Sequence, residues 1–383
     1  MSEQLPHGIL VEADHDEAAR QRFVQSLKVH LATQVSPGNE RIYEERAKPR
    51  FVSALGHEPR DRHDVREVMR QEPYYQMWSA LQRTSQEMMW DSVSTSVERQ
   101  LGKLVEKGRA AGQAGGTLLL NPALAIPAYH AGVDIHVQPG GYHTELSSED
   151  VAAGAIYDRA VYIYAMGRMG PLNDDIGRSA VNHIRREYPD RPRRILDMGC
   201  SVGHSTIPYA EAFPDAEIHA IDVAAPMLRY AHARAESLGF PIHFSQQNAE
   251  QTDFPDGHFD LIVSHILMHE TSARAIKRIV EECHRLLAAD GLMVHAEVPQ
   301  YHDLTPFGAF MLDWDTYNNN EPFWGYYHDL DLEKLSVEGG FEASAISQLM
   351  APSAFEEAQA RTRLLQGGDF AGAGAWFLWI ARK

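Results

Sequence analysis

The chain contains 383 residues, of which 53 are acidic and 35 are basic, and its formal net charge is −18. A chain of this length is too long for most single cores, so it predicts two modest domains or one domain with a large extension. The negative charge repels phosphate backbones and anionic lipid headgroups, which argues against nucleic acids and membrane surfaces as partners and favours a small-molecule or protein substrate.

Residues 1–169 are predicted to form a mostly helical N-terminal domain. Residues 1–21 are acidic and polar, without the basic region and apolar stretch of a secretory signal. An amphipathic helix is predicted next, because apolar residues recur one turn apart on one face. These residues are Phe23, Leu27, Leu31 and Val35.

A longer helix is predicted to begin at Pro73, a residue suited to a first helical turn, and to end near Gly108. Glycine and alanine then crowd residues 108–116, which predicts a turn or a short linker. The most apolar stretch, residues 116–132, is interrupted by two prolines, an asparagine and a histidine. No transmembrane helix is therefore expected.

Residues 135–145 concentrate polar, aromatic and turn residues in one segment. We expect a flexible loop here that covers the substrate or the cofactor. Within it, His136, His143 and Glu145 are residue types that suit zinc or iron, but their spacing matches no metal-binding motif, so no metal is expected. A further helix is predicted over residues 150–169.

The pattern changes near Gly170, and the second domain is placed at residues 170–383. Short apolar runs alternate there with helical stretches, as parallel strands with crossover helices require, which predicts a doubly wound sheet. The predicted strands are residues 194–197, 217–222, 242–246, 259–264 and 291–298. The predicted helices between them are residues 205–213, 226–238 and 273–287. Two further runs, residues 343–349 and 375–381, suit a terminal hairpin.

The turn at residues 197–203 lies between a predicted buried strand and a helix. Gly199 and Gly203 allow the backbone to turn tightly and to approach a ligand closely. Asp222 ends the next strand, where doubly wound folds place a carboxylate that accepts both hydroxyls of a ribose. Together these residues indicate a nucleotide site, although Asp222 by itself could cap the following helix.

Cysteine usage indicates the redox compartment. Only Cys200 and Cys283 occur, and Cys200 falls in the 197–203 turn, where a crosslink would obstruct a ligand. A reducing, cytoplasmic location is expected.

The order of these features resembles the class I S-adenosylmethionine-dependent methyltransferases, in particular the small-molecule branch with the ubiquinone and menaquinone methyltransferases. Further segments match this family in order. They are Asn248, Ala249 and Glu250 after the third strand, Asp256, Gly257, Phe259 and Asp260 leading into the fourth, and Leu286, Leu287, Asp290 and Gly291 leading into the fifth. The resemblance spans residues 193–298 and implies an α/β, Rossmann-like, doubly wound sheet of seven strands, with the helical N-terminal domain as an addition.

The resemblance also implies S-adenosylmethionine as the cofactor. Its methionine part would lie against the 197–203 turn, its ribose against Asp222, and its adenine between Ala249 and Glu250. The residues expected at the cofactor are Tyr164, Asp197, Gly199, Cys200, Ser201, Gly203, Asp222, Val223, Asn248, Ala249, Glu250, Ser264 and His265.

Two of these residues depart from the family's pattern. Ser201 replaces the middle glycine of the loop and restricts the backbone more than glycine does. Asn248 replaces an aspartate, but its amide oxygen still accepts a hydrogen bond from the adenine amine. Tyr164 is expected over the sulfonium, because the face of an aromatic ring attracts a cation. Tyr157 and Tyr162 fit the apolar stripe of an ordinary helix instead.

Methyl transfer from a sulfonium is an in-line displacement that gains speed when the acceptor is held against the methyl group, so no catalytic residue is obligatory. His265 and His269 follow the fourth strand, and either is expected to serve as the base for a hydroxyl or amine acceptor. In the alternative interpretation, His265 caps a helix and His269 is a half-exposed polar residue. Glu297 and His302, after the fifth strand, are lower-ranked candidates.

Residues 301–327 are rich in aromatic side chains, which we expect to share between roofing the acceptor pocket and packing in the core. The preferred interpretation is a methyltransferase acting on an O, N, S or C atom of a small metabolite. Its helical part would cover the pocket and form a homodimer. The alternatives are a nicotinamide-dependent oxidoreductase, whose G-x-G-x-x-G pattern is absent around Gly199, and a non-catalytic nucleotide sensor.

Overall fold

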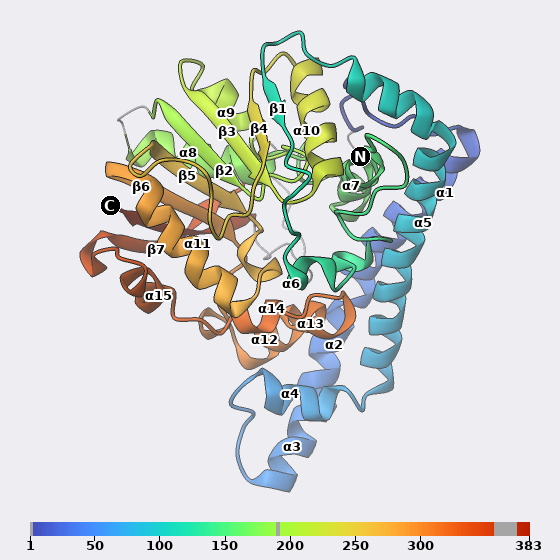
Figure 1. The fold of residues 1–383 in the computed structure, drawn as a ribbon. Helices are drawn as coiled ribbons and strands as arrows, with labels where there is room; N and C mark the ends of the chain where they lie inside the picture. The colour runs from blue at the N-terminus through green and yellow to red at the C-terminus, as the bar shows by residue number, and fades with distance from the viewer. Residues whose placement is uncertain (1–2, 189–191, 356–373) are drawn as a thin grey trace.

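The computed structural model describes residues 3–188, 192–355 and 374–383, and a single sheet organises the described chain (Figure 1). The sheet has eight strands in the order β1-β4-β3-β2-β5-β6-β8-β7. In chain order they are β1 (Thr117–Leu119), β2 (Arg194–Met198), β3 (Glu217–Asp222), β4 (His243–Gln246), β5 (Phe259–His265), β6 (Leu287–Glu297), β7 (Ile346–Pro352) and β8 (Ala375–Arg382). The five predicted parallel strands are confirmed as β2 to β6.

Strand directions confirm both the doubly wound sheet and the terminal hairpin. The neighbours from β1 to β6 along the sheet all pair in parallel. At the other edge, β8 runs antiparallel to β6, and β7 runs antiparallel to β8 with Leu349 opposite Leu378. The structure therefore contains the expected seven strands, in the expected mixed arrangement, with one strand more.

The additional strand, β1, comes from the N-terminal half of the chain and pairs with β4 at the sheet edge. No strand was expected at this position. The backbones meet very closely there, because a Cβ on Gly116 would lie 2.5 Å from the carbonyl oxygen of Ile242. Glu236 fixes the approach, since its Oε1 accepts the Gly116 backbone N–H at 2.7 Å. Three residues are too few to show a strand period, so the sequence pattern could not reveal this pairing.

Helices cover both faces of the sheet, as a doubly wound fold requires. One face packs against α8 (Asp175–Glu187), α9 (Ile207–Ala212) and α10 (Ala225–Ser237). The opposite face packs against α11 (Ala273–Leu286) and α15 (Leu332–Glu338). The three helices predicted between the strands are therefore confirmed as α9, α10 and α11.

The N-terminal region is mostly helical, as expected, and the long helix α5 (Pro73–Arg109) runs along one side of the molecule in Figure 1. It packs against α1 (His15–His30) and α7 (Ala152–Tyr164), which in turn contacts α10. The remaining helical elements of the described residues are short. They are η1 (Leu31–Val35), α2 (Pro37–Ile42), η2 (Tyr43–Ala47), α3 (Lys48–Leu55), α4 (Arg62–Met69), α6 (Ala128–Ala131), η3 (Ile135–Val137), η4 (Met268–Glu270), η5 (Tyr301–Asp303), α12 (Pro306–Leu312), α13 (Trp314–Asn318), α14 (Trp324–Tyr327) and η6 (Ala343–Ala345).

The first helix is confirmed, but the predicted buried face was only partly right, because Leu31 is buried and Phe23 is not. Phe23 is 59% exposed, whereas Gln21 and Lys28 are buried. The polar side chains are buried because they have partners on α5: Lys28 Nζ donates to Gln86 Oε1 at 2.9 Å, and Gln21 donates to Ser96. A hydrophobic period does not detect a buried face that is joined by hydrogen bonds.

No helix among the described residues is long and apolar enough to cross a membrane. Both cysteines are buried free thiols. Burial raises the pKa of the Cys200 thiol well above its usual value, so this thiol is neutral at physiological pH.

Candidate active site

The turn after β2 has the tight backbone that its glycines predict. Gly199 and Gly203 adopt φ angles of +68° and +74°, and Ser201 adopts +50°. A Cβ on Gly199 would lie 2.5 Å from Leu267 Cδ1, so a larger residue would collide with the segment that follows β5. Ser201 thus accepts a left-handed conformation that favours glycine, which is the strain expected where it replaces the family's middle glycine.

The end of β3 meets this turn. Asp222 accepts the backbone N–H of Ser201 through Oδ2 and that of Ala224 through Oδ1, both at 2.9 Å. Burial raises the pKa of Asp222 to about 6, although these backbone hydrogen bonds oppose the shift. The carboxylate is therefore fixed in position beside the loop and titrates just below neutral pH.

Two adjoining pockets surround this loop. The larger encloses about 890 Å³ and the smaller about 730 Å³, each partly open to solvent. Both volumes lie in the range of small-molecule sites. The residues that line both pockets, and so mark their junction, are Tyr157, Gly199, Ser201, His265 and Ile266.

Most residues expected at the cofactor line these pockets. The larger pocket is lined by Tyr164, Asp197, Gly199, Cys200, Ser201 and His265. The smaller is lined by Gly199, Ser201, Asp222, Val223, Asn248, Ala249 and His265. The loop and the ends of β3, β4 and β5 thus converge on one space, at the carboxyl edge of the parallel strands.

Four predicted site residues do not line either pocket. Gly203 closes the turn by donating its N–H to Cys200, and Glu250 accepts a hydrogen bond from Tyr129 at 3.0 Å. Ser264 is fully buried, with its Oγ 2.6 Å from His295 Nδ1. His269 is also fully buried, with its Nδ1 2.7 Å from Glu297 Oε2.

Two polar atoms in the loop are buried and lack a hydrogen-bond partner within the chain. They are Asp197 Oδ1 and Ser201 Oγ, on residues that line the larger pocket. The other Asp197 oxygen accepts from Thr206 Oγ1 at 2.6 Å, which holds the carboxylate in place. Buried polar atoms rarely stay unsatisfied, so these two fit the ammonium and carboxylate groups of a bound amino-acid moiety.

His265 stands at the junction of the two pockets. Its Nε2 lies 3.0 Å from the Tyr209 hydroxyl, and its Nδ1 lies 3.3 Å from Asp197 Oδ1, within ion-pair distance but not aligned as a hydrogen bond. Burial raises the pKa of Tyr209 well above its usual value, so this hydroxyl keeps its proton. An imidazole between a carboxylate and a hydroxyl is oriented as a general base requires.

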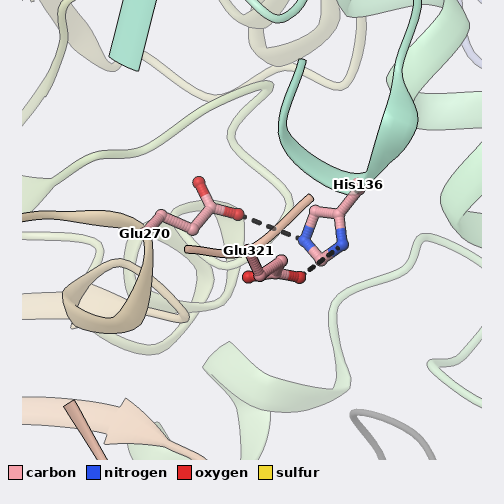
Figure 2. Close-up of side chains that lie close together, drawn as sticks. All are labelled: His136, Glu270 and Glu321. Atoms are coloured by element: carbon pink, nitrogen blue, oxygen red, sulfur yellow. Dashed lines mark ion pairs between the residues drawn. The ribbon is translucent and has the colours of Figure 1, made fainter. Parts of the chain in front are cut away.

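A cluster of three ionisable side chains lies beside the pockets. Figure 2 shows His136 between the carboxylates of Glu270 and Glu321, with Nε2 3.2 Å from Glu270 Oε1 and Nδ1 2.8 Å from Glu321 Oε1. Burial alone would lower the pKa of His136, but the two carboxylates raise it well above its usual value. His136 lines the larger pocket and Glu270 the smaller.

Residues 195–291 match the model of a family described as a methyltransferase domain. The chain carries a class I S-adenosylmethionine-dependent methyltransferase domain. This domain includes the 197–203 turn, Asp222 and His265.

Curated relatives match about a third of the chain. The chain is 33% identical over 126 residues to demethylmenaquinone methyltransferase of Thermus thermophilus, which covers 33% of this chain and 54% of that protein. It is 32% identical over 123 residues to a malonyl-acyl-carrier protein O-methyltransferase of Methylococcus capsulatus, covering 31% of this chain and 42% of that protein. The chain spans about half the length of these relatives.

A solved structure is similar over a larger share of the chain. It is phosphoethanolamine N-methyltransferase 2 of Haemonchus contortus in complex with S-adenosyl-L-methionine, at 16% identity and a TM-score of 0.43. The alignment covers 59% of this chain and 57% of that chain.

The loop at residues 135–145 does not bring His136, His143 and Glu145 together. Glu145 pairs with Arg229, and the ring of His143 lies 5.5 Å from that of His130. His136 alone joins an acidic cluster, with Glu270 and Glu321. Neither partner was predicted, because each lies more than 130 residues away in the sequence and no local motif connects them.

The aromatic segment after β6 contacts mainly the N-terminal helices rather than the pockets of the methyltransferase domain. Phe310 and Trp314 are buried in a cluster with Tyr75 and Trp78 of α5. None of the aromatic residues expected to roof the acceptor site lines either pocket. The expected contribution to the core is therefore observed. The larger pocket is lined instead by the aromatic side chains of Trp90, Tyr157, Tyr164 and Trp376.

Asp158 lies at the centre of a buried network that sequence reasoning missed. Its carboxylate lies 2.8 Å from His7 Nε2, 2.8 Å from His204 Nε2 and 2.7 Å from the Tyr230 hydroxyl. His204 lines the larger pocket, so the network joins the N-terminal segment, α7 and the methyltransferase domain. The available signal was the charged pair Asp158 and Arg159 inside a helix that is otherwise mostly apolar, since a buried charge needs partners.

Proposed function

We propose that the chain is an enzyme that transfers a methyl group from S-adenosylmethionine to an O, N, S or C atom of a small molecule. The observation that carries this proposal is the pair of joined pockets, which meet at the Gly199–Ser201 backbone inside the methyltransferase domain. The cofactor would extend from the smaller pocket into the larger one. The larger pocket continues toward the N-terminal helices, where an acceptor would lie in line with the methyl group.

The residues of the chain fit the proposed cofactor. Its sulfonium supplies an activated methyl group when it is bound. Asp197 Oδ1 and Ser201 Oγ are free to bind the amino-acid part, and Asp222 is positioned to accept the ribose hydroxyls. Ala249 lines the smaller pocket, where the adenine would bind, and Asn248 lies beside it.

For a hydroxyl or amine acceptor, we assign the general base to His265 rather than His269. His265 lines both pockets, whereas His269 lines neither and is held by Glu297. Asp197 Oδ1 lies 3.3 Å from His265 Nδ1 and would stabilise the imidazolium that forms when His265 takes the acceptor proton.

The N-terminal region, residues 1–169, is proposed to cover the substrate and to form a homodimer. Covering is supported by Trp90 and Tyr164, which belong to this region and line the larger pocket. Dimer formation is supported by Met77, Leu81 and Met88, apolar residues on one face of α5 that stay exposed. The two free thiols are consistent with the proposed cytoplasmic location.

The cofactor assignment is tested by calorimetric titration of the protein and its Asp222→Ala variant with S-adenosylmethionine. We expect micromolar binding to the wild type and about tenfold to hundredfold weaker binding to the variant, because hydrogen bonds to a charged acceptor are lost. Asp256→Ala is the matched control, since Asp256 belongs to the same domain but its side chain is 80% exposed. Equal affinities for wild type and Asp222→Ala would refute the assignment of the ribose site.

The same titration separates the alternative functions. Reduced nicotinamide cofactors are titrated in parallel, and tight binding of these with none of S-adenosylmethionine would favour the oxidoreductase. Binding of S-adenosylmethionine without methylated product across a broad metabolite panel would favour the sensor.

Cofactor affinity is also expected to depend on pH through Asp222. The carboxyl has a pKa raised to about 6 and accepts two hydroxyls only when ionised, so affinity should rise from pH 5 to pH 7 and then level off. Well below pH 6, the affinity for S-adenosylmethionine should fall about tenfold for each further pH unit. Calorimetry at several pH values should show this slope in the wild type and a flat profile in Asp222→Asn. A slope that persists in Asp222→Asn would assign the titration to another group.

A further inference from the structure

The His136 cluster joins three segments that are distant in the sequence. His136 lies in η3, Glu270 in η4, and Glu321 in the connection between α13 and α14. One donor atom from each residue lies within 4.8 Å of the other two, and both carboxylates point at the imidazole ring in Figure 2. These three atoms are close enough together to hold one metal ion.

The charges of the cluster favour a cation. The Glu321 side chain is fully buried, and those of His136 and Glu270 are 12% and 14% exposed. Two carboxylates outweigh a single imidazole, even when the imidazole carries a proton, and buried charge is costly unless it is balanced. A divalent ion would balance it.

A second observation points to the same place. His269 is fully buried, its Nε2 has no hydrogen-bond partner, and this atom lies 3.9 Å from Glu321 Oε2. The opposite ring nitrogen, Nδ1, lies 2.7 Å from Glu297 Oε2. A carboxylate behind an imidazole is the arrangement that orients a metal-binding histidine, because it fixes the tautomer that leaves the other nitrogen free to coordinate.

The backbone of His136 is held in an uncommon conformation. Its φ is +53°, and its carbonyl oxygen accepts hydrogen bonds from Trp90 Nε1 at 2.7 Å and Gln86 Nε2 at 3.3 Å. Both donors belong to α5, so the long N-terminal helix positions the imidazole against the methyltransferase domain.

We propose that His136, Glu270 and Glu321, with His269 as a fourth ligand, bind a divalent transition-metal ion of the manganese, iron or zinc type. Mixed imidazole and carboxylate ligands suit these ions, whereas all-oxygen sites suit magnesium and calcium. His136 and Glu270 each line one of the two pockets, so the ion would lie beside their junction. The role of the ion rests on the proposed function. An open coordination position of the ion would hold an oxygen atom of the acceptor and favour the deprotonated form of that oxygen.

The test is calorimetry of the full chain with Mn²⁺ and, separately, with Zn²⁺, after treatment with a chelator and buffer exchange. We expect one ion per chain in the wild type and at least a hundredfold loss of affinity in Glu321→Gln. Glu297→Gln removes the carboxylate behind His269 but keeps an amide oxygen for the backbone N–H groups of Leu267 and Met268, and it should weaken binding by about 10- to 100-fold. Because Glu321 is fully buried, Glu270→Gln provides a second variant, and the thermal midpoint of each protein shows whether it is folded.

Glu145→Gln is the matched control. Glu145 follows His136 in the same loop, but it pairs with Arg229 and should leave metal binding unchanged. Absence of a stoichiometric ion in the wild type, or equal binding by wild type and both cluster variants, would overturn the proposal. Loss in Glu145→Gln with retention in Glu321→Gln would place the ion in the loop instead.

Titration with S-adenosylmethionine on the same samples separates the two proposals. Cofactor binding without an ion would remove the metal site and leave the methyltransferase proposal standing. Binding of an ion without binding of S-adenosylmethionine would support the metal site and remove the methyltransferase proposal.

Discussion

Replacing Asp158 by alanine is expected to lower the free energy of unfolding by about 3–5 kcal/mol, because the partners of a buried charge would be left without it. His7, His204 and Tyr230 all lie within 2.8 Å of this carboxylate. Burial alone would raise the pKa of Asp158, but the two imidazoles hold it well below its usual value, so the side chain is ionised at neutral pH. Denaturant unfolding, followed by far-ultraviolet circular dichroism, measures the change.

A matched variant isolates the effect of burial. Asp16 also lies 3.0 Å from a histidine, His15, but both side chains are largely exposed to solvent. Its replacement by alanine should change stability by less than about 0.5 kcal/mol, the ordinary range for an exposed residue. If Asp158→Ala were as mild as Asp16→Ala, the network would not contribute to joining the N-terminal segment and the methyltransferase domain.

Replacing His265 by alanine is expected to reduce turnover by about 100- to 10,000-fold with a hydroxyl or amine acceptor, the usual contribution of a general base. The affinity for S-adenosylmethionine should change much less, since the proposed ribose and amino-acid contacts come from Asp222, Asp197 and Ser201. Product formation under saturating substrate gives the turnover number, and calorimetry gives the cofactor affinity.

Two further variants test the role of this imidazole. Tyr209→Phe removes the hydroxyl 3.0 Å from His265 Nε2 and should shift the pH profile of turnover while retaining most of it. His302→Ala removes an exposed histidine that lies outside both pockets, and it should have wild-type activity. Turnover within threefold of wild type in His265→Ala would show that positioning alone suffices for the acceptor. Loss of cofactor affinity in place of turnover would make His265 a binding residue.

The sequence predicted those features that depend on neighbouring residues. The strands β2 to β6 are short apolar runs, and the glycines of the 197–203 turn follow the first of them, so strand, turn and helix could be recognised together. Asp222 was predicted because it ends the next strand, and parallel strands end at a common edge. Local pattern and topology were sufficient for this part of the site.

Features that depend on distant contacts were not accessible to the same reasoning. Glu321 is 185 residues from its partner His136, and nothing in its neighbourhood distinguishes it from a surface glutamate. Lys28 is buried where Gln86 of α5 accepts its hydrogen bond and the Tyr164 ring faces its ammonium group, so the predicted apolar face was only partly right. Such contacts form only when the helices and strands pack together. The period of apolar residues along the sequence does not predict them.

The edge strand β1 carries a consequence for how the chain can be divided. Although the predicted boundary lies at residue 170, β1 belongs to the first part in sequence and to the second in space. Removing residues 1–169 would uncover the N–H and C=O groups of β4 along one side, and an open strand edge readily pairs with another chain. Residues 170–383 should therefore be expressed and engineered together with residues 1–169, as one polypeptide.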